Sequence, residues 1–192
     1  MIDLSELRRL LKKDEVRSIS RRYFVSNGFD GTLTSVGIAV GSYLSGVPDG
    51  LTVFQIGVGA AVGLGTSGVW SVWEIERAEK HAEIQDLERA MLTDLDDTAL
   101  MRDKRSARIV NAVASGIGPL IGIVIPLVPY LFEGAALSMF EATAAAVALG
   151  VCILFAFGAY VGSVADLDWR VAGLRMGLAG LVVAAINVLL PG

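Results

Sequence analysis

Asp30 is the residue whose type and position indicate chemistry most sharply. It lies near the start of a predicted apolar helix, in the segment of residues 26–35, with Asn27 three positions before it and Thr34 four positions after it on the same helical face. A carboxylate at the centre of a membrane helix costs about 2.5–3.5 kcal/mol, so it is normally kept only where it faces a cavity, a partner or an ion. We interpret Asp30 as part of an ion or transport site. The alternative is a solvated carboxylate at interface depth, roughly one or two turns inside the basic flank, that only orients the helix.

A second group of carboxylates follows the second apolar stretch. They are spaced i, i+3, i+7 and i+10, which places them along one helical face: Glu76, Glu79, Glu83 and Asp86. Repulsion along that face requires compensation, and a divalent cation could supply it because carboxylate oxygens are hard-metal ligands. Arg77, Lys80 and Arg89 on neighbouring turns could supply it equally well. Both interpretations stay open at this point.

Other chemistries find little support in the sequence. No Ser or Cys nucleophile motif, P-loop or paired Cys/His zinc motif is present, so we expect neither an enzyme nor a zinc site, and no resident cofactor. The net charge of −4 and the placement of the basic residues give no case for nucleic-acid binding. Ion or small-solute movement, or a structural membrane role, remains.

Five apolar stretches must position these residues. They are residues 24–46, 51–73, 109–132, 138–163 and 171–190. Each is near the ~20 residues that a helix needs to cross ~30 Å of hydrocarbon. The sequence therefore predicts an all-α, polytopic membrane protein with five transmembrane helices and a cytoplasmic helical extension between helices 2 and 3.

The basic residues predict the orientation of these helices. All 16 Lys and Arg residues fall within residues 8–22, 77–108 and 170–175, which lie on one side of the membrane if the chain threads back and forth. By the positive-inside rule the N-terminus is cytoplasmic and the C-terminus extracytoplasmic.

Three segments can be distinguished along the chain. Residues 1–23 read as a basic amphipathic helix at the cytoplasmic leaflet, or alternatively as a free regulatory arm. Residues 24–192 form the transmembrane domain. Within it, residues 74–108 form an acidic insert that we expect to prolong the second helix into the cytoplasm and to turn back around residues 93–98.

Small residues predict close helix packing. A G-x-x-x-G pair occurs in every apolar stretch: Gly37 and Gly41, Gly59 and Gly63, Gly118 and Gly122, Gly158 and Gly162, Gly173 and Gly177. Such residues let helix backbones approach one another in lipid. The third stretch also contains Pro119, Pro126 and Pro129, which remove backbone donors and should bend or locally open that helix.

These features resemble the vacuolar iron transporter family. The first stretch, SNGFDGTLTSVGIAVGSYLSGV, is similar to the family's first-helix motif, and GLGTSGVWS followed by a Glu-rich helix, and IPLVPYLF in the third stretch, look like their counterparts. The resemblance implies a homodimeric, proton-coupled exporter of Fe2+ and also of Mn2+ from the cytoplasm. Asp30 matches the family's first-helix aspartate, and on that match it binds the metal, the proton, or both in turn.

The chain also departs from that family. Where the family has a Glu and a Met in the second helix, this chain has apolar or small residues around Ile56 and Leu64, with Gln55 close by, and the missing thioether weakens the inference to iron. The acidic insert is shortened, leaving Glu76, Glu79 and Glu83 as candidate metal ligands. We expect a transport path through Asp30, Asn27, Thr34 and Gln55. The alternatives are a non-transporting structural or regulatory membrane protein on the same scaffold, and a transporter of a different ion.

Overall fold

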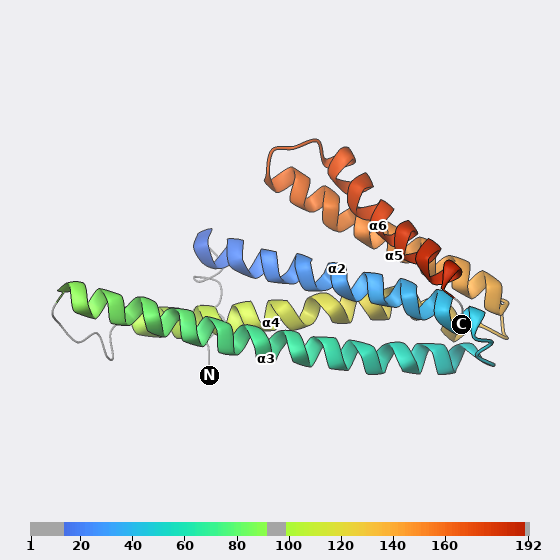
Figure 1. The fold of residues 1–192 in the computed structure, drawn as a ribbon, viewed down its shortest axis with the longest axis horizontal. Coiled ribbons are helices and arrows are strands. Elements are labelled where there is room, and N and C mark those ends of the chain that lie inside the picture. The colour runs from blue at the N-terminus through green and yellow to red at the C-terminus, as the bar shows by residue number, and fades with distance from the viewer. Residues whose placement is uncertain (1–13, 92–98, 191–192) are drawn as a thin grey trace.

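The computed structural model describes residues 14–91 and 99–190, and these residues form five long helices. In chain order the elements are α2 (Asp14–Leu44), α3 (Gly50–Met91), α4 (Ala99–Leu127), the 3₁₀ helix η1 (Val128–Phe132), α5 (Met139–Val164) and α6 (Trp169–Leu189). The described residues contain no named strand, so the predicted all-α class is confirmed. Figure 1 shows α3 and α4 as a long pair with α2 along them, and α5 and α6 as a second pair that crosses α2.

Four of the described helical stretches are long and apolar enough to span a membrane: Gly50–Met91, Ser106–Phe132, Met139–Val164 and Trp169–Leu189. They match four of the five predicted spans, two of which extend one residue beyond the helical stretch at one end. The helix that carries residues 24–46, α2, is less apolar, although its 31 residues are long enough to cross ~30 Å of hydrocarbon. Its polar side chains Thr32 and Ser35 are fully buried within the bundle, where both hydroxyls donate to backbone carbonyls of α2 itself. Such local satisfaction lets a polar helix lie at membrane depth.

The contacts between helices fix their directions. α2 and α4 run parallel, because Ser20 contacts Asn111 at one end and Ala39 contacts Tyr130 at the other. α3 is antiparallel to α4, since Glu83 pairs with Lys104 while Gly57 packs against Leu127. This is the alternation that a chain threading back and forth requires.

The second pair of helices continues the same alternation. α5 is antiparallel to α2, as the contacts of Phe157 with Phe24 and of Gly150 with Val36 show, and α6 returns alongside α5. The start of α2, the far end of the α3–α4 pair and the α5–α6 connection therefore lie at the same end of the bundle (Figure 1). The described basic residues gather at that end.

The ends of the helices follow from local sequence. Asp49 accepts hydrogen bonds from the backbone N–H and the hydroxyl of Thr52 and so caps α3. Ser138 and Glu141 form a reciprocal capping box at the start of α5. Asp168 caps α6 by accepting from the N–H of Arg170. The helices α3, α5 and α6 thus each begin at a short polar signal.

The core lies where α2, α3, α4 and α5 converge near η1. Its fully buried side chains include Val53, Ile123, Leu127 and Tyr130. The Tyr130 hydroxyl bridges two helices, since it donates to the carbonyl of Ala39 at 3.2 Å and lies 2.9 Å from the Thr143 hydroxyl. A buried phenol needs such partners, because an unsatisfied polar group in hydrocarbon costs several kcal/mol.

The glycines of the five pairs have different surroundings. A Cβ at Gly118 or Gly122 would lie 2.5 Å from a backbone oxygen of α2, and one at Gly158 would lie equally close to the backbone of α6. These glycines let helices of one chain touch. By contrast, Gly41, Gly59 and Gly63 have nothing within 4 Å of such a Cβ, so their faces are open in the single chain.

The structure also shows how the predicted segments relate to the helices. α2 runs without a break through residues 23 and 24, and residues 1–13 lie outside the described residues. The acidic insert consists of the continuation of α3 to Met91 and the start of α4 at Ala99, while the predicted turn around residues 93–98 lies outside the described residues.

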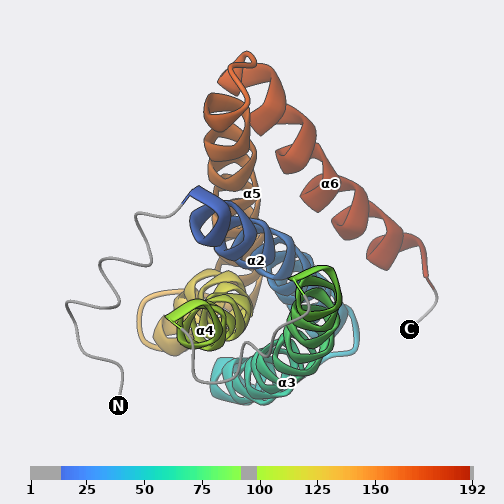
Figure 2. The ribbon, with the colours of Figure 1, turned by 90° about the vertical axis from the view of Figure 1, so that its left-hand side faces the viewer.

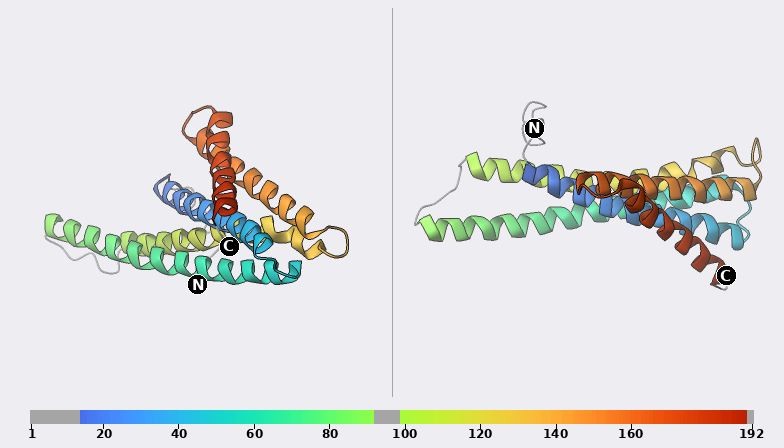
Figure 3. Two further views of the ribbon diagram at one scale, coloured as in Figure 1. Left: turned by 45° about the vertical axis from the view of Figure 1, so that its right-hand side comes forward. Right: turned by 90° about the horizontal axis from the view of Figure 1, so that it is seen from above.

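α4 stays α-helical through Pro119 and Pro126 and passes into the 3₁₀ turn only at Val128. Figure 3 shows the α3–α4 pair reaching beyond the other helices.

Candidate ion site

The register between α2 and α4 places Asp30 beside the middle of an apolar stretch. The next residue, Gly31, packs against the backbone of Pro119, where an added Cβ would be 2.7 Å from the proline Cα. Pro119 is the central residue of the apolar stretch Ser106–Phe132. Asp30 is therefore level with the middle of this apolar stretch of α4, although on α2 itself it lies about two turns after Arg22.

The Asp30 side chain points out of the single chain. It is exposed, and it makes no hydrogen bond or ion pair with the residues that the structure describes. Exposed or half-buried small and polar residues share this side of α2, which we call the outward polar face: Ser26, Asp30, Thr34, Gly37 and Gly41. The Thr34 hydroxyl donates to the Asp30 carbonyl at 2.8 Å, so it covers the backbone of α2 and leaves the carboxylate free.

Asn27 turns the other way. Its amide donates to the hydroxyl and to the carbonyl of Ser115 on α4, and it lies close to Gly68 of α3. A side chain on Gly68 would collide with the Ser115 hydroxyl at 2.9 Å, so the glycine makes room for this contact. Asn27 and Asp30 thus lie on different sides of α2, and Asn27 joins three helices.

Gln55 is remote from both. It is exposed on α3, close to Gly57, whose neighbours are Leu127 and Ile123 near the η1 end of the bundle. The residue of α3 that lies beside Asn27 is Gly68, and thirteen helical residues correspond to about 20 Å along the axis. Of the four predicted path residues, the structure therefore keeps Asp30 and Thr34 on one face and places Asn27 and Gln55 elsewhere.

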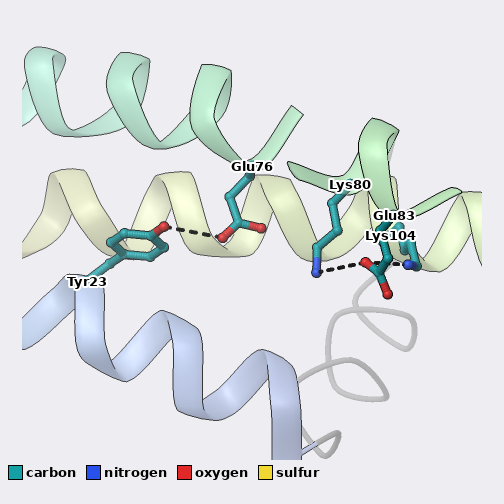
Figure 4. A network of polar contacts seen from close by, with 5 residues as sticks. All are labelled: Tyr23, Glu76, Lys80, Glu83 and Lys104. Atoms are coloured by element: carbon teal, nitrogen blue, oxygen red, sulfur yellow. Dashed lines mark hydrogen bonds and ion pairs between the residues drawn. The ribbon is translucent and has the colours of Figure 1, made fainter. Parts of the chain in front are cut away.

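Glu76 is the buried member of the cytoplasmic carboxylates. It is 1% exposed, and its Oε1 accepts a hydrogen bond from the Tyr23 hydroxyl at 3.3 Å (Figure 4). Burial raises the pKa of the Tyr23 phenol, and the negative charges of Glu76 and Glu79 raise it further. The second oxygen of Glu76, Oε2, is buried and has no hydrogen-bond partner among the described residues. An orphaned carboxylate oxygen can accept a proton or bind a cation.

Glu83 has cations as partners. Lys104 of α4 approaches its Oε2 to 2.5 Å, and Lys80 lies 3.9 Å from the same oxygen (Figure 4). The hydrogen bond from Lys104 lowers the pKa of Glu83, against the opposing effect of partial burial. Glu79, between the two on the sequence, is exposed. Within residues 14–91 and 99–190, no three carboxylate, His or Cys side chains are grouped closely enough to hold a metal ion.

Several polar residues at these sites were not singled out from the sequence. They are Ser20, Tyr23, Lys104, Asn111 and Ser115. Asn111 carried a detectable signal, because an amide inside an apolar stretch is costly unless it is bonded. It is 1% exposed and accepts a 2.7 Å hydrogen bond from Ser20. The other partners depend on the register between helices far apart in sequence, which single-helix spacing does not contain.

Comparison with known proteins gives a family match. The sequence model described as the VIT family matches residues 71–191, more than half of the 192-residue chain. An uncharacterized archaeal protein of Methanocaldococcus jannaschii is 23% identical over 168 residues, which cover 86% of this chain and 85% of that relative. The matched family region includes the acidic insert and α4–α6 and begins after Asp30.

Proposed function

Because the chain belongs to the VIT family, whose members are membrane metal-ion transporters, we propose that it carries Fe2+ and Mn2+ out of the cytoplasm in exchange for protons. The proposal extends to a homodimer with a cytoplasmic N-terminus. The basic residues at one end of the bundle support this orientation through the positive-inside rule.

The observation that carries the proposal is the position of Asp30. A carboxylate level with the centre of the apolar stretch of α4, exposed and without a partner in its own chain, requires water, a cation or another copy of the protein. Carboxylate and hydroxyl oxygens are the ligands that hard divalent cations prefer, and Ser26 lies one turn from Asp30 on the same face. The same carboxylate can hold a proton when no metal is bound, which couples the two ions through one group.

A second copy offers the simplest cover for the outward polar face. Gly41 on that face has open space around it, whereas a Cβ on Gly37 would lie 3.7 Å from the amide nitrogen of Asn187 on α6. In lipid, small residues of this kind let two helices approach closely. A two-fold axis along α2 would bring two Asp30 carboxylates to one path and double the ligands available to a cation.

The cytoplasmic carboxylates would deliver the metal to this path. Glu79 is exposed, and Glu76 keeps one oxygen without a hydrogen bond. Glu83 would join them less readily as a third ligand, because the ammonium groups of Lys80 and Lys104 already lie at its Oε2. We therefore propose Glu79 as the first contact, with Glu76 and Glu83 as ligands of lower occupancy.

The test is metal and proton flux in liposomes that contain the purified full-length protein. We expect Fe2+ and Mn2+ flux linked to a pH gradient in the wild type, and flux at the level of empty liposomes for Asp30→Asn. Asp86→Asn is the matched control, because it removes the same charge from an exposed site on α3. Glu79→Gln should raise the metal concentration needed for half-maximal flux and leave the maximal rate in place.

The outcomes separate the alternatives. If the wild type moves neither metals nor protons while it remains folded, the protein is a structural or regulatory membrane protein on this scaffold. If it moves protons with another ion, the architecture is that of a transporter and the assignment of Fe2+ and Mn2+ is wrong. If Asp30→Asn transports like the wild type, Asp30 is not on the path.

A further inference from the structure

A pocket lined by basic residues lies between α3 and α4, just beyond their apolar stretches. Its volume is about 420 Å³, and its charged and titratable lining residues are Glu74, Arg77, Lys80, His81, Lys104 and Arg108. We call it the basic pocket. Four cationic side chains and one carboxylate line it, and Glu83 pairs with two of those cations from beside it. The lining thus keeps an excess of positive charge, which suits an anion.

The basic pocket is a formed site with a covered floor. The side chains of Lys80 and Lys104 are 17% and 11% exposed, so their ammonium groups are held between the helices. Arg77 stands at the rim with 66% of its side chain exposed. The Arg108 guanidinium lies 4.0 Å above the centre of the Trp73 ring, which fixes it in place.

An apolar groove adjoins this pocket along the same two helices. Its volume is about 430 Å³, and its large lining residues are Val62, Val69, Trp70, Val113, Ile117 and Leu120. On α3, the groove residues Val62 and Val69 are seven residues apart, Arg77 of the pocket follows eight residues later, and Lys80 three residues after that. These spacings place the four side chains along one side of the helix, so the groove and the pocket follow one another there. Figure 2 shows α2, α5 and α6 on one side of the α3–α4 pair, and no described helix on the other.

Two tryptophans mark the boundary between groove and pocket. Trp70 lines the groove and is 70% exposed, and Trp73 lies under Arg108. Tryptophan is enriched at the level of the lipid headgroups, and basic pockets on the cytoplasmic side of membrane helices bind anionic headgroups. The groove thus lies at hydrocarbon depth and the pocket at headgroup depth.

We propose that one anionic phospholipid binds here, with its phosphate in the basic pocket and an acyl chain in the apolar groove. The Lys80 and Lys104 ammonium groups and the Arg77 and Arg108 guanidinium groups would donate to the phosphate oxygens. The lipid would brace the point at which the α3–α4 pair leaves the membrane. The site is separate from the outward polar face of α2, and the proposal does not depend on the transported ion.

The test uses tryptophan quenching by lipids with brominated acyl chains. The full-length protein with Trp169→Phe keeps Trp70 and Trp73, both beside the proposed site, as its reporters. In nanodiscs of phosphatidylcholine, brominated phosphatidylglycerol should quench at a mole fraction about tenfold lower than brominated phosphatidylcholine, a preference that corresponds to about 1.4 kcal/mol. This comparison needs no change in the pocket itself.

Variants then locate the site. Arg77→Gln with Lys80→Gln should remove the preference for phosphatidylglycerol, whereas Arg170→Gln with Arg175→Gln, two basic residues of α6, should leave it unchanged. Equal quenching by both lipids in the Trp169→Phe protein would overturn the proposal, as would an equal loss in both double variants. Millimolar inorganic phosphate serves as the soluble competitor, and if it abolishes the preference, the pocket selects a free anion and the lipid assignment is wrong.

Discussion

The two sides of α2 treat polar residues in opposite ways. On the inner side, Ser20 bonds to Asn111 and Asn27 bonds to Ser115, so both of these polar side chains of α2 meet one of α4. On the outward polar face, Asp30 meets no described residue and Gly41 has open space around it. The polar side chains of α2 on the inner side thus find partners within one chain, whereas the Asp30 carboxylate on the outer side has none among the described residues. In this helix the polar type of a residue does not distinguish Asp30 from the polar residues of the inner side. The presence or absence of a partner in the same chain does.

The largest effect should come from filling the inner side. Gly122→Ala places a Cβ 2.5 Å from the Gly28 carbonyl oxygen, where backbone must move. We expect a loss of about 1–3 kcal/mol in the free energy of unfolding, typical of overpacking. Gly41→Ala should change it by less than about 0.5 kcal/mol, since nothing lies within 4 Å of the added Cβ. Reversible unfolding in mixed detergent micelles measures both, and equal effects would break the distinction between the two sides.

Dimerisation should depend on the outward polar face and not on the inner side of α2. Gly41→Leu puts a large side chain on the outward polar face, at a position where an added Cβ meets nothing within 4 Å, and we expect about tenfold weaker dimerisation. Gly59→Leu is the matched control on α3, where a Cβ also meets nothing within 4 Å. Fluorescence transfer between labelled copies in liposomes reports the association. A loss with Gly59→Leu alone would move the interface from α2 to α3.

The sequence predicted some features of the two sides of α2 and not others. Apolar length predicted the helices of four spans, their order and the continuation of α3, and the cost of a buried charge singled out Asp30. The sequence also predicted Asn27 as a neighbour of Asp30 on one face, since residues three apart on a helix are close. A three-residue step leaves two side chains about 60° apart around the helix, and in the structure the packing of α4 against one side takes Asn27 inward while Asp30 stays outside.

The cytoplasmic carboxylates show the same limit. Spacing along α3 predicted that Glu76, Glu79 and Glu83 share a face, and Lys80 was among the predicted compensating cations. Spacing could not provide Tyr23 or Lys104, because these partners come from α2 and α4. The depth of Asp30 was likewise set by its packing against Pro119, a contact between two helices almost ninety residues apart in the chain.

A smaller effect separates Asn27 from its neighbour Ser26. Asn27→Ala removes the hydrogen bonds to Ser115, and we expect a loss of about 1 kcal/mol in stability with metal flux per folded molecule retained. Ser26→Ala, on the outward polar face, should leave stability within about 0.5 kcal/mol of the wild type. Unfolding and flux are measured on the same preparations. If Asn27→Ala stays fully stable and loses flux, Asn27 belongs to the transport path and the contrast between the two sides fails.

The smallest effect concerns the ion pair of Glu83 and Lys104, which joins α3 to α4 beyond the membrane, where water competes with the pairing. The Lys104 hydrogen bond lowers the pKa of Glu83 below its ordinary 4.5, so the pair stabilises the fold at neutral pH and loses this contribution as the pH falls below about 4.5 and through the lowered pKa. Because the Glu83 side chain is 51% exposed, the contribution should stay under about 1 kcal/mol. Glu83→Gln should therefore be less stable than the wild type at pH 7 and converge with it toward pH 3. Asp86→Asn, whose partner Arg89 is 76% exposed, should match the wild type at both values. If the difference in stability between Glu83→Gln and the wild type widened as the pH fell, the charged carboxylate would be destabilising. Packing alone would then have to hold α3 and α4 together beyond the membrane.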